Sequence, residues 1–107
     1  MDGRLTMLAA AVLLSSGAAH GADIASGLDS ARKLCVNCHV VEPKSSAQKA
    51  LTAGIPSFMV IANKEGQSES KLKAFMLDPH PPMPQVQLTT HELDNLASYI
   101  LSLKGKN

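Results

Sequence analysis

The segment Cys35-Val36-Asn37-Cys38-His39 contains both cysteines of the 107-residue chain, and a histidine follows the second one directly. Two thiols separated by two residues can lie on one helical turn, where each can add across one vinyl group of a haem. The imidazole of the next residue can then bind the iron from one side. This spacing is the attachment pattern of c-type haem. The sequence therefore predicts one haem c, held covalently by Cys35 and Cys38, with His39 as the proximal iron ligand.

Other uses of a Cys-x-x-Cys pair fit the chain less well. A redox-active dithiol sits at a helix N-terminus after a strand, whereas residues 24–34 have the pattern of a helix. A structural zinc site needs about four ligands, usually in two pairs, and His80 and His91 do not have the spacing of a second pair. A disulfide across so short a loop would add little stability.

The first 22 residues have the pattern of an export signal. A weakly basic start precedes a short apolar run at 5–14, and the small residues of 15–22 end in a plausible cleavage site. The apolar run is shorter than the roughly 20 residues that a membrane span needs, and an uncleaved anchor is the alternative. We expect cleavage after Gly21 or Ala22, and a single periplasmic domain at residues 23–107.

The composition of this domain favours a fold built around a cofactor. The chain has one tyrosine, two phenylalanines and no tryptophan, which is little material for the core of so small a domain. A buried porphyrin would fill the centre. The formal net charge of +1 lacks the basic excess of a nucleic-acid-binding protein. We interpret the lysine pairs Lys44/Lys49 and Lys71/Lys73 as solvated faces rather than a docking patch.

Helical spacing and capping residues predict an all-α domain of three to four helices with long loops. Thr89 and Glu92 form a capping box, and Asp78 before a proline avoids the helical region. The expected elements are a helix at 23–37, a loop at 40–54, a short helix at 57–63, a third helix that begins after Ser68 and ends at Asp78, and a last helix that begins at Thr89 and closes at 104–106.

Apolar residues at helical spacing predict which face of each helix is buried. These residues are Ile24, Gly27, Leu28, Ala31, Leu34 and Cys35 in the first helix, Leu72, Phe75, Met76 and Leu77 in the third, and Leu93, Leu96, Ala97, Ile100, Leu101 and Leu103 in the last.

A haem iron bound by His39 needs a ligand on its other face, and Met83 is the leading candidate. Met83 lies between the third and last helices in the proline-rich segment 79–84. Flanking prolines fix φ and leave the loop few conformations, so the thioether could be held at the iron. A Met/His ligand pair raises the reduction potential of the iron.

We interpret the remaining histidines and methionines of the domain as surface or core residues rather than iron ligands. His80 lies on the same loop as Met83 and competes with it, because His80 would give a bis-histidine site; we favour a surface position. His91 is expected to face solvent. Met59 and Met76 lie on apolar helical stripes and are interpreted as core residues.

Residues 23–103 resemble a small, single-haem class I cytochrome c of bacterial type. The resemblance rests on the Cys35–His39 motif, Gly27, the segments 56–58 and 82–84, and the terminal helix with Tyr99. It implies a cytochrome c fold with long loops wrapped around one covalently bound haem.

The resemblance also assigns supporting roles. In this family a glycine of the first helix lets an aromatic residue of the last helix pack closely across it, and Gly27 and Tyr99 match that pair. A proline carbonyl accepts the proximal imidazole N–H, and Pro56 matches that proline. Ala31 departs from the family, in which an aromatic residue is frequent here, and this leaves the detail of the helix–helix contact open.

The implied function is that of an exported carrier, not an enzyme. It would pass single electrons between a redox protein donor and acceptor, without a small-molecule substrate and without nucleic acid. It would meet a membrane only through a partner or an uncleaved signal. The alternative is a dedicated haem subunit of a periplasmic dehydrogenase or oxidase complex. A gas sensor or peroxidase needs an open or labile iron site, which ligation by Met83 would close.

Overall fold

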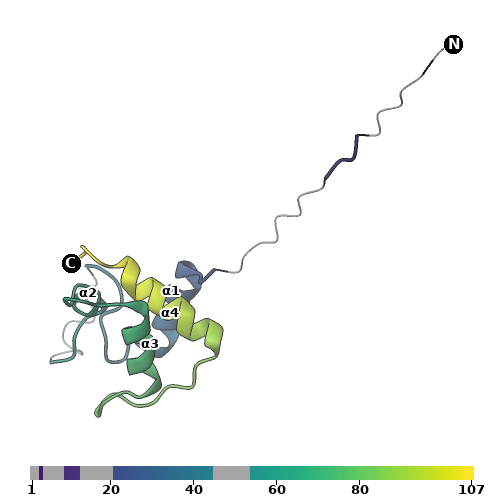
Figure 1. Ribbon diagram of the computed structural model, residues 1–107. Coiled ribbons are helices and arrows are strands. Elements are labelled where there is room, and N and C mark those ends of the chain that lie inside the picture. Colours follow the sequence, from purple (N-terminus) through teal and green to yellow (C-terminus); the bar gives the residue numbers. More distant parts are fainter. Residues whose placement is uncertain (1–2, 4–8, 13–20, 45–53) are drawn as a thin grey trace.

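The computed structural model describes residues 3, 9–12, 21–44 and 54–107. These residues form four helices and no strands (Figure 1), which confirms the all-α prediction: α1 Ile24–Leu34, α2 Phe58–Ala62, α3 Glu69–Leu77 and α4 Thr90–Ser102. None of these four is long and apolar enough to cross a membrane. Most of the predicted export signal, and residues 45–53 with Lys49, lie outside the described residues.

The helices begin where the capping residues predict. Ser57, Ser68 and Thr89 each accept a hydrogen bond in the side-chain oxygen from a backbone N–H of the first turn, as N-cap residues do. Asp23 caps α1 in the same way, through Ala25 N–H at 2.9 Å. The capping box at the start of α4 is present, so the local signals for these starts are confirmed.

Two helices end earlier than predicted. α1 ends at Leu34 instead of Asn37, because Cys35 has φ −115° and the chain continues as a turn in which Cys38 N–H donates to Cys35 O at 3.2 Å. α4 ends at Ser102, since Leu103 N–H donates three residues back, to Ile100 O. Gly105, at φ +81°, has the left-handed conformation common after a helix C-terminus.

Helix α4 is the centre of the described domain (Figure 1). It packs most extensively on α1 and also contacts α2 and α3, whereas those three helices make no comparable contact with one another. The buried cluster is drawn from α4 and the faces turned toward it: Ala31, Val41, Phe58, Met59, Ala62, Leu72, Leu96, Ala97, Tyr99, Ile100 and Leu103. The predicted buried face of α4 and the core position of Met59 are therefore confirmed.

Parts of the predicted faces on α1 and α3 are wrong. Phe75 is 43% exposed and Leu77 58% exposed, and Ile24 and Leu34 are about as open. Only Leu72 of α3 is fully buried in the core, because α3 contacts α4 over a narrow strip and its other apolar side chains lie outside that strip.

Lys73 is less solvated than predicted. Its ammonium group lies against Asp94 of α4 and 3.3 Å from Glu69 on the previous turn of α3. The carboxylates of these two ion pairs, that of Asp94 foremost, raise the pKa of Lys73 above its usual value. Lys73 therefore joins α3 to α4 as part of an ion pair, while Lys44 and Lys71 are exposed as predicted.

Asn63 ties the C-terminal segment to α2. Its amide nitrogen donates to Met59 O at 2.8 Å and to Lys106 O at 3.1 Å, and its amide oxygen accepts from Gly105 N–H at 2.7 Å. One side chain thus closes the end of α2 and fixes the chain after α4.

The contact between α1 and α4 depends on Gly27. A Cβ added to this residue would lie 2.7 Å from Tyr99 Cβ and closer still to the carbonyl oxygen of Asn95. Atoms cannot approach so closely, and backbone atoms of α4 cannot move aside as a flexible side chain could. The close approach implied by the resemblance at Gly27 and Tyr99 is present.

We predict that Gly27→Ala destabilises the folded holoprotein by about 3 kcal/mol, the upper end for overpacking a core. The clash would force α1 away from α4, and denaturant unfolding followed by helical circular dichroism measures the loss. Lys33→Ala, at an exposed position of the same helix, is the control and should leave the midpoint close to that of the parent. An unchanged midpoint for Gly27→Ala would contradict the close helix contact.

Candidate functional site

The segment Cys35–His39 forms a turn at the end of α1. Cys35 N–H donates to Ala31 O at 2.9 Å, and His39 N–H donates to Cys35 O at 2.8 Å. Residues three and four apart on such a turn lie on the same side. Cys35 is half-buried and Cys38 is exposed, and burial raises the pKa of the Cys35 thiol to about 11. Redox-active dithiols have lowered pKa values, so this environment does not fit dithiol chemistry.

The His39 ring has a defined protonation pattern. Its Nδ1 lies 2.7 Å from the carbonyl oxygen of Pro56, the contact expected from the resemblance. A carbonyl oxygen can only accept, so Nδ1 must carry the proton. In the neutral ring, Nε2 then has a free lone pair, and this is the form of imidazole that binds a metal. The hydrogen bond also fixes the orientation of the ring.

The residues after His39 are held on both sides. Val40 O accepts from Phe58 N–H at 2.9 Å, at the start of α2, and Val41 O accepts from the Tyr99 hydroxyl of α4. Burial raises the pKa of Tyr99 above its usual value, and the protonated hydroxyl is the donor of this bond. The segment that positions His39 is therefore joined to two helices by backbone atoms.

Aromatic rings add a second layer to this arrangement. The Phe58 ring lies between His39 and Tyr99, with centroid separations of 5.4 Å and 6.4 Å. Both pairs are tilted and fall within the range of favourable aromatic contacts. Phe58 is buried, so it packs one side of the imidazole against the core.

An apolar pocket lies beside the motif. Its lining comes from the end of α1, from α3, from the loop after α3 and from α4: Leu34, Cys35, Met76, Met83, Val86, Leu88 and Leu96. The structure thus brings Cys35 and Met83 to one pocket, although 47 residues lie between them in the sequence. The sulfur atoms of a thiol and of thioethers are the only side-chain heteroatoms in this lining.

His80 is directed elsewhere. Its ring packs edge-on against Phe75 with a centroid separation of 5.4 Å, it is exposed, and it does not line the pocket. Its carbonyl oxygen accepts from Met83 N–H at 3.0 Å, which forms the turn that carries Met83. The pocket geometry favours Met83 over His80, and His91 is exposed as predicted.

Two aspects of the site were not found in the sequence. Met76 packs against the core as predicted, but it also lines the same pocket as Met83, which was not predicted. No role was predicted for Val86 and Leu88. Their apolar side chains, two residues apart after Met83, were the signal that could have placed them on the pocket side of the loop. Cys38, His39 and Pro56 do not line this pocket. Cys38 and His39 follow Cys35 on the turn, and Pro56 accepts the hydrogen bond of His39.

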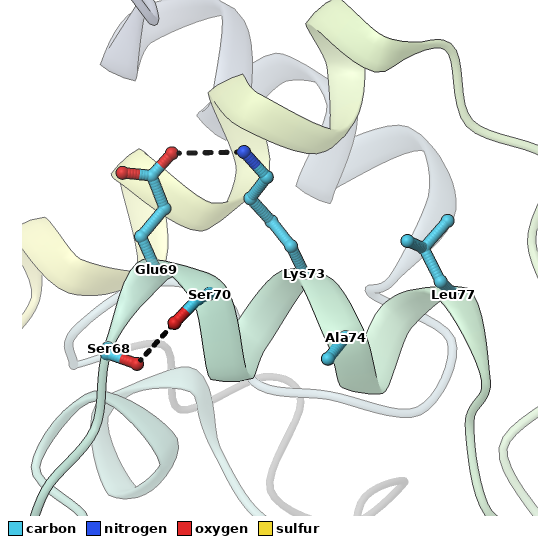
Figure 2. A pocket seen from close by; sticks show the side chains of 6 residues that line it. All are labelled: Ser68, Glu69, Ser70, Lys73, Ala74 and Leu77. Carbon is cyan, nitrogen blue, oxygen red and sulfur yellow. Dashed lines mark hydrogen bonds and ion pairs between the residues drawn. The ribbon is translucent and has the colours of Figure 1, made fainter.

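A second hollow lies along α3 (Figure 2). Its lining is Ser68, Glu69, Ser70, Lys73, Ala74 and Leu77, and the side chains of Glu69 and Lys73 point to the same side and form an ion pair. The Ser68 hydroxyl caps the helix and bonds Ser70. These polar groups are paired with one another, so the hollow contains no group poised for chemistry.

The donors beside the apolar pocket fit a haem. Two thiols on one turn can form thioethers, and the imidazole Nε2 and the Met83 thioether are the donor types that bind haem iron. No group of three or more His, Cys, Asp or Glu side chains within the described ranges could hold a metal ion directly. The two thiols, the imidazole and the thioether are together the groups that hold an iron inside a porphyrin.

Comparisons with known proteins agree with this geometry. The family model described as cytochrome c matches residues 24–104. Cytochrome c-552 of Bradyrhizobium diazoefficiens is 41% identical over 97 residues, which are 91% of this chain and 90% of that relative. No solved structure is a significant match. The matched region includes the Cys35–His39 motif, Pro56 and Met83.

We predict that the tryptic peptide 34–44 carries the mass of one haem. Cys35→Ser and Cys38→Ser should each retain one thioether, and the reduced pyridine haemochrome band should shift to longer wavelength because one vinyl group stays unsaturated. The parent, with both vinyl groups saturated, is the reference. An unshifted band in either variant would show that the replaced thiol is not attached.

Proposed function

The chain belongs to the cytochrome c family, and from this premise we propose that it is an exported electron carrier with His39 and Met83 as its axial ligands. Proteins of this family hold one covalent haem c, transfer electrons between redox protein partners and are not enzymes. The function of this chain is accordingly electron transfer. The ligand pair, the attachment residues and the export of the chain are the parts that we propose.

The pairing of His39 with Pro56 carries the proximal assignment. The hydrogen bond at 2.7 Å leaves Nε2 as the free donor atom and holds the ring while electrons enter and leave. When bound, the haem would supply a one-electron couple between ferric and ferrous iron. The chain would contribute the attachment through Cys35 and Cys38, and a ring that does not need to reorient.

The shared pocket of Cys35 and Met83 supports the distal assignment. Thioether sulfur is a soft donor that favours ferrous iron, so Met83 would raise the reduction potential relative to a second imidazole. The lining residues Val86, Leu88 and Leu96 would exclude water from the Met83 side. A site occupied by two protein ligands has no open position for substrate, which agrees with a carrier.

The proposed boundary between signal and domain is supported by the contacts of Asp23. Its backbone N–H donates to Asn95 Oδ1 of α4 at 2.8 Å, and its carboxylate accepts from Ala25 and Ser26. Gly21 and Ala22 are exposed and make no such hydrogen bond to another described residue. Cleavage after Ala22 would leave the α1 cap and its tie to α4 intact.

We predict that Met83→Ala removes the weak near-infrared charge-transfer band of the oxidised protein, which reports thioether bound to ferric iron. The potential should fall, and cyanide or carbon monoxide should bind, because the distal position opens. Met83→His should keep six ligands but also lower the potential, since imidazole favours ferric iron more than thioether does. Absorption spectra and redox titration measure these changes.

His80→Ala is the matched control on the same loop. It should leave the band and the potential nearly unchanged, because the His80 ring lies against Phe75. If His80→Ala disrupts the spectrum and Met83→Ala does not, the site is bis-histidine and the assignment of Met83 is wrong.

Export is tested by mass and location together. The mature protein released from the periplasm should have the mass of a polypeptide that begins at residue 22 or 23, plus one haem. A membrane-bound product that keeps residues 1–22 would show that the N-terminal segment is an anchor.

A further inference from the structure

The side chain of Gln85, two residues after Met83, connects the loop that carries Met83 back to the end of α3. Gln85 Nε2 donates to the backbone carbonyl oxygen of Leu77, the last residue of α3, at 3.3 Å. The hydrogen bond joins positions eight apart and has Met83 between them. The carbonyls of the last helical turn lack partners within the helix, and the Gln85 amide supplies one to Leu77.

We propose that Gln85 is a positioning residue that holds the Met83 thioether at its site by joining the returning half of the loop to the end of α3. The inference rests on the proposed ligation by Met83. Gln85 does not line the pocket, whereas Met83, Val86 and Leu88 on either side of it do. Gln85 therefore acts from outside, on the backbone that presents these three side chains.

Few other hydrogen bonds hold the loop at this point. Met83 N–H bonds His80 O within the turn itself, and Pro84 fixes φ but has no N–H to donate. Of the hydrogen bonds among the described residues, the Gln85 amide is the one that crosses from the Met83 side of the loop to α3. Its loss would allow the segment around Met83 to move away from the pocket while the helices remain folded.

The chain provides a matched control in Gln87. It is the same residue type two positions later, it is exposed like Gln85, and its side chain makes no hydrogen bond to another described residue. Gln85→Glu keeps the size of the side chain but cannot donate to a carbonyl at neutral pH, and it places a negative charge at the negative end of α3. Gln87→Glu makes the same charge change without breaking the contact.

The test measures how often Met83 leaves the iron. In the oxidised holoprotein, binding of excess imidazole is limited by dissociation of the thioether, followed as loss of the near-infrared band. Loss of one ordinary hydrogen bond corresponds to a change of about two- to tenfold in such an equilibrium. Gln85→Glu and Gln85→Ala should bind imidazole faster by this factor, and Gln87→Glu and Gln87→Ala should match the parent.

Asn63→Ala separates positioning from general stability. It removes three hydrogen bonds at the end of α2, so it should lower the denaturant midpoint but leave the rate of imidazole binding unchanged. If the parent has the near-infrared band and the Gln85 variants bind imidazole no faster than the Gln87 variants, the positioning role of Gln85 is wrong, and the ligation by Met83 is unaffected. A parent without the band would overturn the ligation by Met83 and this inference together.

Discussion

The hydrogen bond between His39 Nδ1 and the Pro56 carbonyl is the constraint on which the site depends. It decides the protonation of the ring, because a carbonyl can only accept, and so decides which nitrogen is free to bind. Pro56 can perform this role only if the start of α2 stays against the turn after α1. The bond from Phe58 N–H to Val40 O supplies that connection at 2.9 Å.

This arrangement is in turn held by α4. Tyr99 donates to Val41 O and packs on Phe58, and its own position requires the close approach of α4 to Gly27. Gly27 does not line the apolar pocket, but a change at Gly27 would displace Tyr99 and, through Tyr99, alter the position of His39. Contacts run without a break from Gly27 of the first helix through Tyr99 and Phe58 to the imidazole ring of His39.

Local patterns in the sequence predicted the features that depend on neighbouring residues, and the family resemblance supplied the contacts of Gly27 with Tyr99 and of His39 with Pro56. The caps at Ser68 and Thr89 are local, and both were predicted, whereas Ser57 was placed inside the helix that it caps. The exposure of Phe75 could not be read from helical spacing, because spacing shows that an apolar stripe exists but not how wide a strip the neighbouring helix covers. Met76 packs against the core as predicted, but helical spacing could not show that it also lines the apolar pocket.

The two sides of the site differ in how firmly they are held. On the His39 side, backbone atoms bond to α2 and α4, and buried rings of Phe58 and Tyr99 fill the space between. On the Met83 side, the supporting contacts come from a loop whose residues are exposed or half-buried. Regions with few buried contacts open at lower free-energy cost than the core. Opening of the site is therefore expected on the Met83 side, with the proximal ring and the helices still in place.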